Sequence, residues 1–183
     1  MAQIALVTDS TGYIPQEKIE KHGIEVVPLY VNFPDEVLED GPIDNALFFK
    51  KMRGSSKLPF TSQPSPGDFI KVYEKLIKEG KEIISIHISA GISGTVESAN
   101  SAARMVDPAR ISVVDSQFTS GGLAMMVLYA ARAVEEGKTR EEVVASLEKL
   151  KSKTHILFVP DTLEYLRKGG RIGGAQALLG TLL

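Results

Sequence analysis

Residues 81–95 read KEIISIHISAGISGT, and this stretch decides the class of fold. A β-branched apolar run over residues 83–88 passes directly into a loop of glycines and hydroxyls, and a helical period follows from Thr95 to Met105. A strand, a small-residue loop and a helix in that order are typical of a parallel sheet with crossover helices. Because the run is nearly all apolar, we expect a strand covered on both faces.

The same alternation recurs outward from this stretch in both directions. We expect further strands over residues 4–7, 25–31, 111–114 and 156–159. The sequence therefore predicts an α/β fold with a mostly parallel sheet and helices on both of its faces.

Several of the helices between these strands carry start signals. Ser65-Pro66-Gly67-Asp68 combines a capping serine, a proline at the first helical position and an acid in the first turn, and it predicts a helix ending near Gly80. Thr139-Arg140-Glu141-Glu142 is a capping box ahead of an amphipathic stretch. A further helix is expected over residues 121–136.

Composition excludes several classes of protein. Among 183 residues, 21 Lys and Arg against 23 Asp and Glu give a net charge of −2, which argues against a nucleic-acid partner. The absence of cysteine excludes disulfides, thiolate zinc sites and a cysteine nucleophile. No apolar run approaches the roughly 20 residues of a membrane helix, and the first residues lack the features of a signal peptide. We therefore expect a cytoplasmic protein without stable membrane insertion.

Hydroxyl side chains gather where the expected strands end, the edge at which open parallel sheets bind ligands. Capping and turn formation explain about half of these residues. Hydroxyls together with backbone amides at helix N-termini also suit an anion. The hydroxyl-bearing loops cover residues 8–12, 60–64, 89–95, 115–120 and 161–162.

Catalytic machinery is not evident in the sequence. His22, His87 and His155 are placed as structural residues, and no nucleophile elbow, Walker loop or dinucleotide fingerprint occurs. We expect no catalytic residue, cofactor or metal. An alternative is a small-molecule phosphotransferase or phosphatase that uses Asp9 and Asp115, with Asp161 as a further candidate ligand for magnesium. A DNA-associated regulator or a pure interaction module is a third possibility, and the net charge counts against DNA.

Five motifs stand in register along the chain: Val7-Thr8-Asp9-Ser10-Thr11, Thr61-Ser62-Gln63-Pro64-Ser65, Ser89-Ala90-Gly91-Ile92-Ser93-Gly94-Thr95, Val114-Asp115-Ser116 and Gly169-Gly170-Arg171-Ile172. In their order and spacing they resemble the DegV family across essentially the whole chain. The resemblance implies two α/β lobes that enclose one long-chain fatty acid, such as palmitate, with its carboxylate held by hydroxyls and its tail in an apolar tunnel. It also implies a non-catalytic subunit that presents the acid to a separate bacterial fatty acid kinase.

The resemblance assigns the carboxylate contacts to Thr61 and Ser93. The backbone amides of Gly94 and Thr95, at the start of a helix, agree with this assignment because they would complete the hydrogen bonds to an anion. Ser62 ranks below Thr61 because its hydroxyl can instead cap its own loop. For the tail we expect a lining from side chains beside these loops, namely Phe60, Ile92, Phe118 and Leu123.

The expected domain boundaries follow from the alternation of strands and helices and from the resemblance to the DegV family. The strand and helix alternation stops after Pro160-Asp161, and family members usually continue well beyond the Gly-Gly-Arg-Ile segment. We therefore expect a first lobe over residues 1–160. Residues 161–183 would be the start of a second lobe that is truncated, and this lobe would therefore be missing or only begun. Within this segment we expect a helix over residues 175–179.

Overall fold

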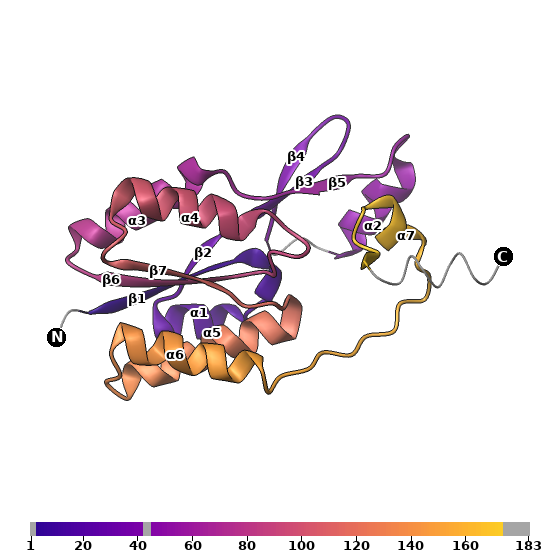
Figure 1. The fold of residues 1–183 in the computed structure, drawn as a ribbon. Helices are drawn as coiled ribbons and strands as arrows, with labels where there is room; N and C mark the ends of the chain where they lie inside the picture. Colours follow the sequence, from indigo (N-terminus) through magenta and orange to yellow (C-terminus); the bar gives the residue numbers. More distant parts are fainter. Residues whose placement is uncertain (1–2, 42–44, 174–183) are drawn as a thin grey trace.

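A four-stranded parallel sheet forms the centre of the molecule (Figure 1). The computed structural model describes residues 3–41 and 45–173. The strand order is β2-β1-β6-β7, with every neighbouring pair parallel, and Leu6 of β1 lies opposite Ile84 of β6. The mostly parallel sheet is therefore confirmed. Its strands are β1 (Ile4–Asp9), β2 (Glu25–Val27), β6 (Glu82–His87) and β7 (Ile111–Asp115).

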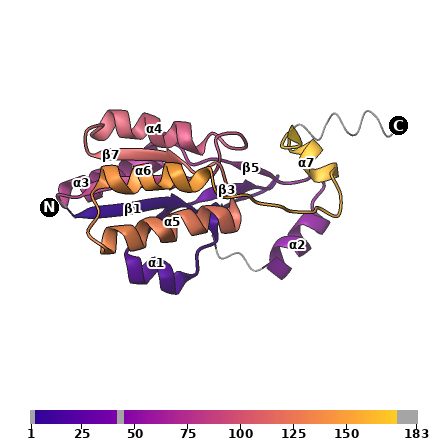
Figure 2. The same ribbon diagram turned by 60° about the horizontal axis from the view of Figure 1, so that its bottom comes forward.

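Helices cover both faces of this sheet, as predicted (Figures 1 and 2). α3 (Pro66–Lys78) and α4 (Thr95–Val106) lie on one face, and α1 (Gln16–His22), α5 (Ser120–Glu135) and α6 (Arg140–Lys151) lie on the other. Alternate residues of each strand point to opposite faces, so the sheet separates two apolar cores. Leu6 packs with the core of α5 and α6, whereas Val7 packs with the core of α3 and α4.

Local capping explains why two of these helices begin where they do. The Ser65 hydroxyl accepts the N–H of Asp68, and the Asp68 carboxylate accepts the N–H of Ser65, which closes the capping box of α3. Thr139 and Glu142 make the same reciprocal pair at the start of α6. Both predicted helix starts are therefore confirmed.

A second sheet of antiparallel strands stands beside the carboxyl end of the first. It has the order β4-β3-β5, formed by β4 (Val37–Asp40), β3 (Leu29–Asn32) and β5 (Phe60–Ser62). The single strand expected over residues 25–31 is wrong, because it divides at Pro28 into β2 and β3, which belong to different sheets. Proline has no N–H for a strand ladder, so a break at this position costs no hydrogen bond.

The strand expected over residues 156–159 is also wrong. This segment has no regular structure, and the side chains of Leu157 and Val159 are 96% and 95% exposed. It runs as an extended connection from α6 to α7 (Glu164–Lys168), away from both sheets (Figure 1). An apolar run becomes a strand only when a neighbour accepts its backbone hydrogen bonds, and here none lies alongside.

Three helical segments lie outside the predicted set. They are α1, α2 (Asn45–Gly54) and α7, and a short 3-10 turn, η1 (Ser10–Gly12), follows β1. The helix expected over residues 175–179 lies outside the described residues. Within the described ranges, no helix is long and apolar enough to cross a membrane.

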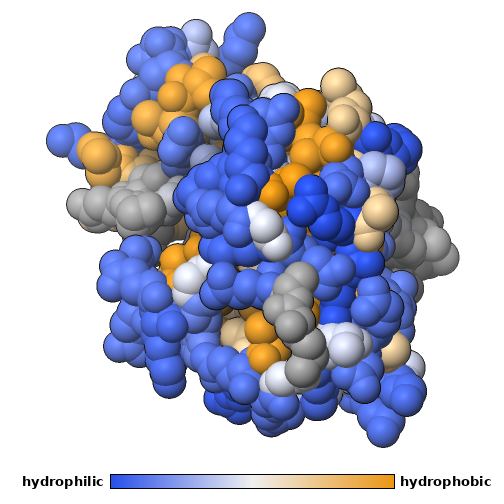
Figure 3. Space-filling view, turned by 90° about the vertical axis from the view of Figure 1, so that its left-hand side faces the viewer, coloured by the Kyte–Doolittle hydropathy of each residue, from blue (hydrophilic) through white to orange (hydrophobic). Residues whose placement is uncertain are grey.

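The surface at the amino ends of the parallel strands is mainly hydrophilic (Figure 3).

Candidate functional site

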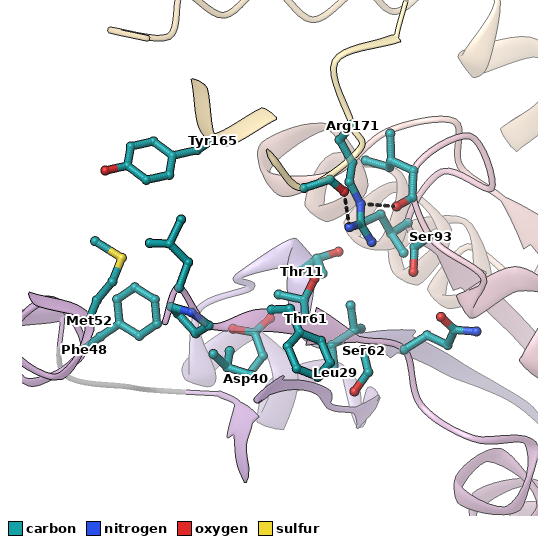
Figure 4. Close-up of a pocket in the computed structure, with 18 of the residues that line it drawn as sticks. Thr11, Leu29, Asp40, Phe48, Met52, Thr61, Ser62, Ser93, Tyr165 and Arg171 are labelled. Carbon is teal, nitrogen blue, oxygen red and sulfur yellow. Dashed lines mark hydrogen bonds between the residues drawn. The ribbon is translucent and has the colours of Figure 1, made fainter. Parts of the chain in front are cut away.

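A cavity of about 1070 Å³ lies at the carboxyl edge of the parallel sheet. Its walls come from η1, the second sheet, the loop before α4, α2 and the segment around α7. Ser93 and Arg171 stand at one end, whereas Phe48, Met52 and Tyr165 stand at the other (Figure 4). The cavity is therefore polarised, with hydroxyls and Arg171 at one end and large, mainly apolar side chains at the other, and the charged side chains of Asp40 and Lys168 line it as well.

Thr61 reaches this cavity because of the strand register. It pairs with Val31 across the antiparallel β3–β5 ladder, and Val31 lines the cavity too. Side chains of directly opposed residues lie on the same face of a sheet, so Thr61 points to the cavity side. The structure places Thr61 in a strand of the second sheet, which corrects the expected loop at a parallel strand end.

Ser62 faces the other way because successive strand residues alternate. It pairs with Tyr30, and its hydroxyl accepts a hydrogen bond from the Asn32 side-chain amide at 3.0 Å. Ser62 contributes to the cavity wall, but its hydroxyl is already used on the opposite face. Thr61 and Ser62 are therefore adjacent in the sequence, but their side chains lie on opposite faces of β5.

Ser93 lies at the start of α4, with its hydroxyl 2.8 Å from that of Thr95. Either hydroxyl can donate in this pair, so Ser93 can direct its own hydrogen to a ligand while it accepts from Thr95. Thr95 is fully buried, and neither Gly94 nor Thr95 lines the cavity. Of the predicted site residues, Thr61, Ser62 and Ser93 line the cavity, whereas Thr95 lies outside it with its hydroxyl and its N–H bonded to the Ser93 hydroxyl, and Gly94 is the residue between them.

Arg171 supplies positive charge at the hydroxyl end of the cavity. Its Nε donates to the carbonyl of Ile92 at 3.3 Å, and a terminal nitrogen donates to the carbonyl of Gly169 (Figure 4). The first bond joins the Gly-Gly-Arg-Ile segment to the loop that carries Ser93. The sequence identified this segment as a motif but assigned no site role to Arg171.

The apolar end of the cavity comes mainly from α2, a helix absent from the predictions. Phe48 contacts Phe33 edge to face, with ring centroids 6.0 Å apart, and Met52 lies one turn further along. Among the four expected tail contacts, Phe60 and Ile92 do line the cavity. The other two are wrong, because Leu123 is fully buried in the core against α6 and Phe118 packs on that core.

Asp40 lies in the wall between the two ends and was not predicted. Its carboxylate accepts a hydrogen bond from the Ser10 hydroxyl at 3.0 Å. Burial and the negative charge of Asp9 raise the pKa of Asp40 above its usual value, although hydrogen bonds from Ser10 and Tyr13 act in the opposite direction. An anionic ligand in the same cavity would be repelled by the ionised Asp40 carboxylate.

The two aspartates of the phosphotransferase alternative are both occupied by structural hydrogen bonds. Asp9 is 1% exposed and accepts from Thr11, His87 and Ile88. Burial alone would raise the pKa of Asp9, but these hydrogen bonds outweigh it and lower the pKa, so the carboxylate is ionised.

Asp115, the second aspartate of that alternative, is partly buried and accepts structural hydrogen bonds through one of its oxygens. Asp115 accepts the N–H groups of Ala90 and Gln117, at 3.2 and 2.9 Å. Across the described ranges, no group of three His, Asp or Glu side chains could hold a metal ion.

Two of the three histidines, His22 and His87, make structural contacts. His22 lies 2.7 Å from Glu135, joining α1 to α5, and His87 is fully buried behind Asp9. His155 is an exposed residue of the connection before α7. None of the three lines the cavity.

Fold and cavity together define the class of protein: an open α/β domain with a ligand-sized cavity at the carboxyl edge of its sheet. A family model described as "Uncharacterised protein, DegV family" matches residues 3–183, and the chain belongs to the DegV family. The chain spans about 65% of the length of the curated relatives that it matches.

Solved structures of similar proteins share this architecture. A DegV family protein from Thermus thermophilus, described by its fatty acid binding, is 48% identical with a TM-score of 0.91, over 99% of this chain and 65% of that one. DegV of Bacillus subtilis, described as a fatty acid binding protein, is 38% identical with a TM-score of 0.85, over 100% and 66% of the two chains.

A more distant structure shows the same fold. The fatty acid kinase B3 protein of Streptococcus pneumoniae, loaded with linoleic acid, is 24% identical with a TM-score of 0.81, over 100% of this chain and 65% of that one.

Proposed function

We propose that this protein binds a long-chain fatty acid, with the carboxylate at the hydroxyl end of the cavity and the tail toward α2. The polarity of the cavity carries this proposal, because an amphiphile with one anionic end matches it in one orientation only. Thr61 and Ser93 would donate hydrogen bonds to the carboxylate, and Arg171 would offset its charge. The fatty acid binding of the Thermus thermophilus and Bacillus subtilis relatives supports the same ligand class.

We further propose that the bound acid is presented to a separate fatty acid kinase in the cytoplasm. The shared fold of the Streptococcus pneumoniae kinase component agrees with this role. A non-catalytic role agrees with the structural hydrogen bonds of Asp9 and Asp115. We also propose that residues 1–160 form one lobe and that residues 161–183 begin another, since the relatives are longer than this chain.

Extraction of the purified protein with organic solvent, followed by mass spectrometry, tests the ligand class. A co-purifying long-chain acid is the expected result. Titration with palmitate and with methyl palmitate then tests the anion site, and the acid should bind more tightly than the ester. Equal affinity for the two compounds would contradict a carboxylate site. Magnesium-dependent release of phosphate from a small phosphate ester would favour the phosphotransferase instead.

A further inference from the structure

Asp9 is a buried carboxylate that does not itself contact the proposed ligand. Its Oδ1 accepts the N–H of Thr11 at 3.1 Å and the hydroxyl of Thr11 at 2.6 Å. Its Oδ2 faces His87 Nδ1 at 3.0 Å and accepts the N–H of Ile88 at 2.8 Å. Two carboxylate oxygens offer about four acceptor sites, so protein donors saturate Asp9.

A chain of buried hydrogen bonds continues from Asp9 through His87. Tyr73 donates to the Ser85 hydroxyl at 2.7 Å, and the Ser85 oxygen lies 2.6 Å from His87 Nε2. The Asp9 carboxylate can only accept, so His87 Nδ1 donates to it, and His87 links Asp9 to Ser85 and Tyr73. All four side chains are at most 1% exposed.

Asp9 joins two segments that line the cavity. Thr11 belongs to η1 after β1, and Ile88 is the first residue after β6. Ile88 opens the loop that leads to Ser93, and in that loop the Ser89 carbonyl accepts the N–H of Ser93 at 3.1 Å. One carboxylate thus sets the separation between the turn that carries Thr11 and the loop that carries Ser93.

The bond to Asp9 also decides what Thr11 offers to a ligand. Its hydroxyl hydrogen is committed to Oδ1, so the oxygen has only lone pairs left for the cavity. Ser93 differs, because its bond with Thr95 leaves the direction of donation open. The hydroxyls around the cavity are therefore not equivalent in their chemistry.

We propose that Asp9 is a positioning residue for the ligand site: it holds Thr11 and Ile88 in place, and because it takes the Thr11 hydroxyl hydrogen, donation to a ligand carboxylate is left to other groups such as Thr61 and Ser93. The ligand part of this inference rests on the proposed fatty-acid function. The positioning of the two segments does not, because it concerns the protein before any ligand binds.

Asp9→Asn compared with Ser85→Ala tests the positioning. Asparagine replaces one acceptor oxygen by a donor, so the backbone N–H of either Thr11 or Ile88 loses its acceptor whichever way the amide turns. Ser85→Ala cuts the chain on the far side of His87 and leaves all the bonds of Asp9 in place. The measurements are thermal stability, palmitate affinity, and amide hydrogen exchange over residues 88–95.

Both variants should lose thermal stability, but only Asp9→Asn should affect the site. We expect its exchange over residues 88–95 to quicken roughly tenfold or more, and its palmitate affinity to fall by a similar factor. Ser85→Ala should keep the exchange and affinity of the native protein. Equal effects of the two variants at equal loss of stability would overturn the proposal and make Asp9 a purely structural residue.

Thr11→Val and Thr11→Ser keep the proposal testable if Asp9→Asn does not fold. Thr11→Ser retains the hydroxyl bond to Asp9 and should bind palmitate as the native protein does, whereas Thr11→Val loses that bond and, through the loosened turn, should bind palmitate roughly tenfold more weakly. Native affinity in Thr11→Val would contradict the positioning of Thr11 by Asp9. A native protein that binds no fatty acid would overturn the proposed function, and the exchange comparison would still decide the role of Asp9.

Discussion

The side-chain amide of Gln63 lies directly against the backbone of Gly94, so that a Cβ at position 94 would stand 2.5 Å from its Nε2. Gln63 follows β5 and Gly94 precedes α4, so this approach joins the segment of Thr61 to the loop of Ser93. The absence of a side chain at Gly94 therefore lets the two proposed carboxylate contacts come from adjoining segments.

Gly94→Ala should consequently weaken ligand binding more than it weakens the fold. The methyl group displaces the end of the flexible Gln63 side chain, so we expect a stability loss below about 1 kcal/mol. Palmitate affinity should drop several-fold, as calorimetric titration would measure. Gly91→Ala is the matched control, because a Cβ there would lie 3.4 Å from the Ser89 hydroxyl, close to ordinary contact. Adding Gln63→Ala to Gly94→Ala should restore affinity if the displaced amide is the cause.

Thr61→Val and Ser93→Ala each remove one proposed donor to the carboxylate. A hydrogen bond to a charged group contributes about 1.5 to 3 kcal/mol, so palmitate affinity should fall roughly ten- to a hundred-fold in each variant. The two losses need not add, because both donors serve one group. Methyl palmitate provides the control, since its neutral head group should show little further loss in either variant. Unchanged palmitate affinity in both variants would contradict the assignment.

Asp40→Asn should stabilise the protein at neutral pH. Folding raises the pKa of Asp40, chiefly through burial. At a pH above that pKa, the ionised carboxylate lowers the free energy of unfolding, and protonation in acid removes this loss. The variant should therefore unfold at higher urea concentration than the native protein at pH 7, and the gap should close as pH falls below the ordinary aspartate range. It should also bind palmitate more tightly at pH 7. A variant that is less stable at pH 7 would show that the Ser10 bond needs the charge.

Gly122→Ala should destabilise the start of α5. A Cβ there would lie 2.3 Å from Ile156 Cδ1 and 2.9 Å from Phe118 Cβ, and the second contact is close to the backbone and cannot easily move. We expect a loss of about 1 to 3 kcal/mol in urea unfolding. Gly121→Ala is the neighbouring control with nothing within 4 Å, and it should be neutral or slightly stabilising. Similar losses at both positions would point to helix geometry instead of crowding.

Sequence reasoning found part of the candidate site. Thr61 and Ser93 were identified through motifs, and both line the cavity. Phe48 and Met52 were missed because the sequence at the start of α2 lacks the capping box that marks α3 and α6. Arg171 and Asp40 were missed as site residues because a charged side chain in a loop or short strand carries no local sign of what it faces.

By itself, the sequence determined the parallel sheet and most of its helices, because apolar runs and capping boxes act over a few neighbouring residues. Only the tertiary structure decided which strands pair, since a ladder needs a partner from elsewhere in the chain. The break at Pro28 therefore created an unpredicted second sheet, and residues 156–159 remained unpaired. The register of β5 turned Thr61 toward the cavity and Ser62 away from it. Donors from distant parts of the chain likewise converge on Asp9. A buried, ionised carboxylate is out of contact with water, so its hydrogen bonds must come from the protein.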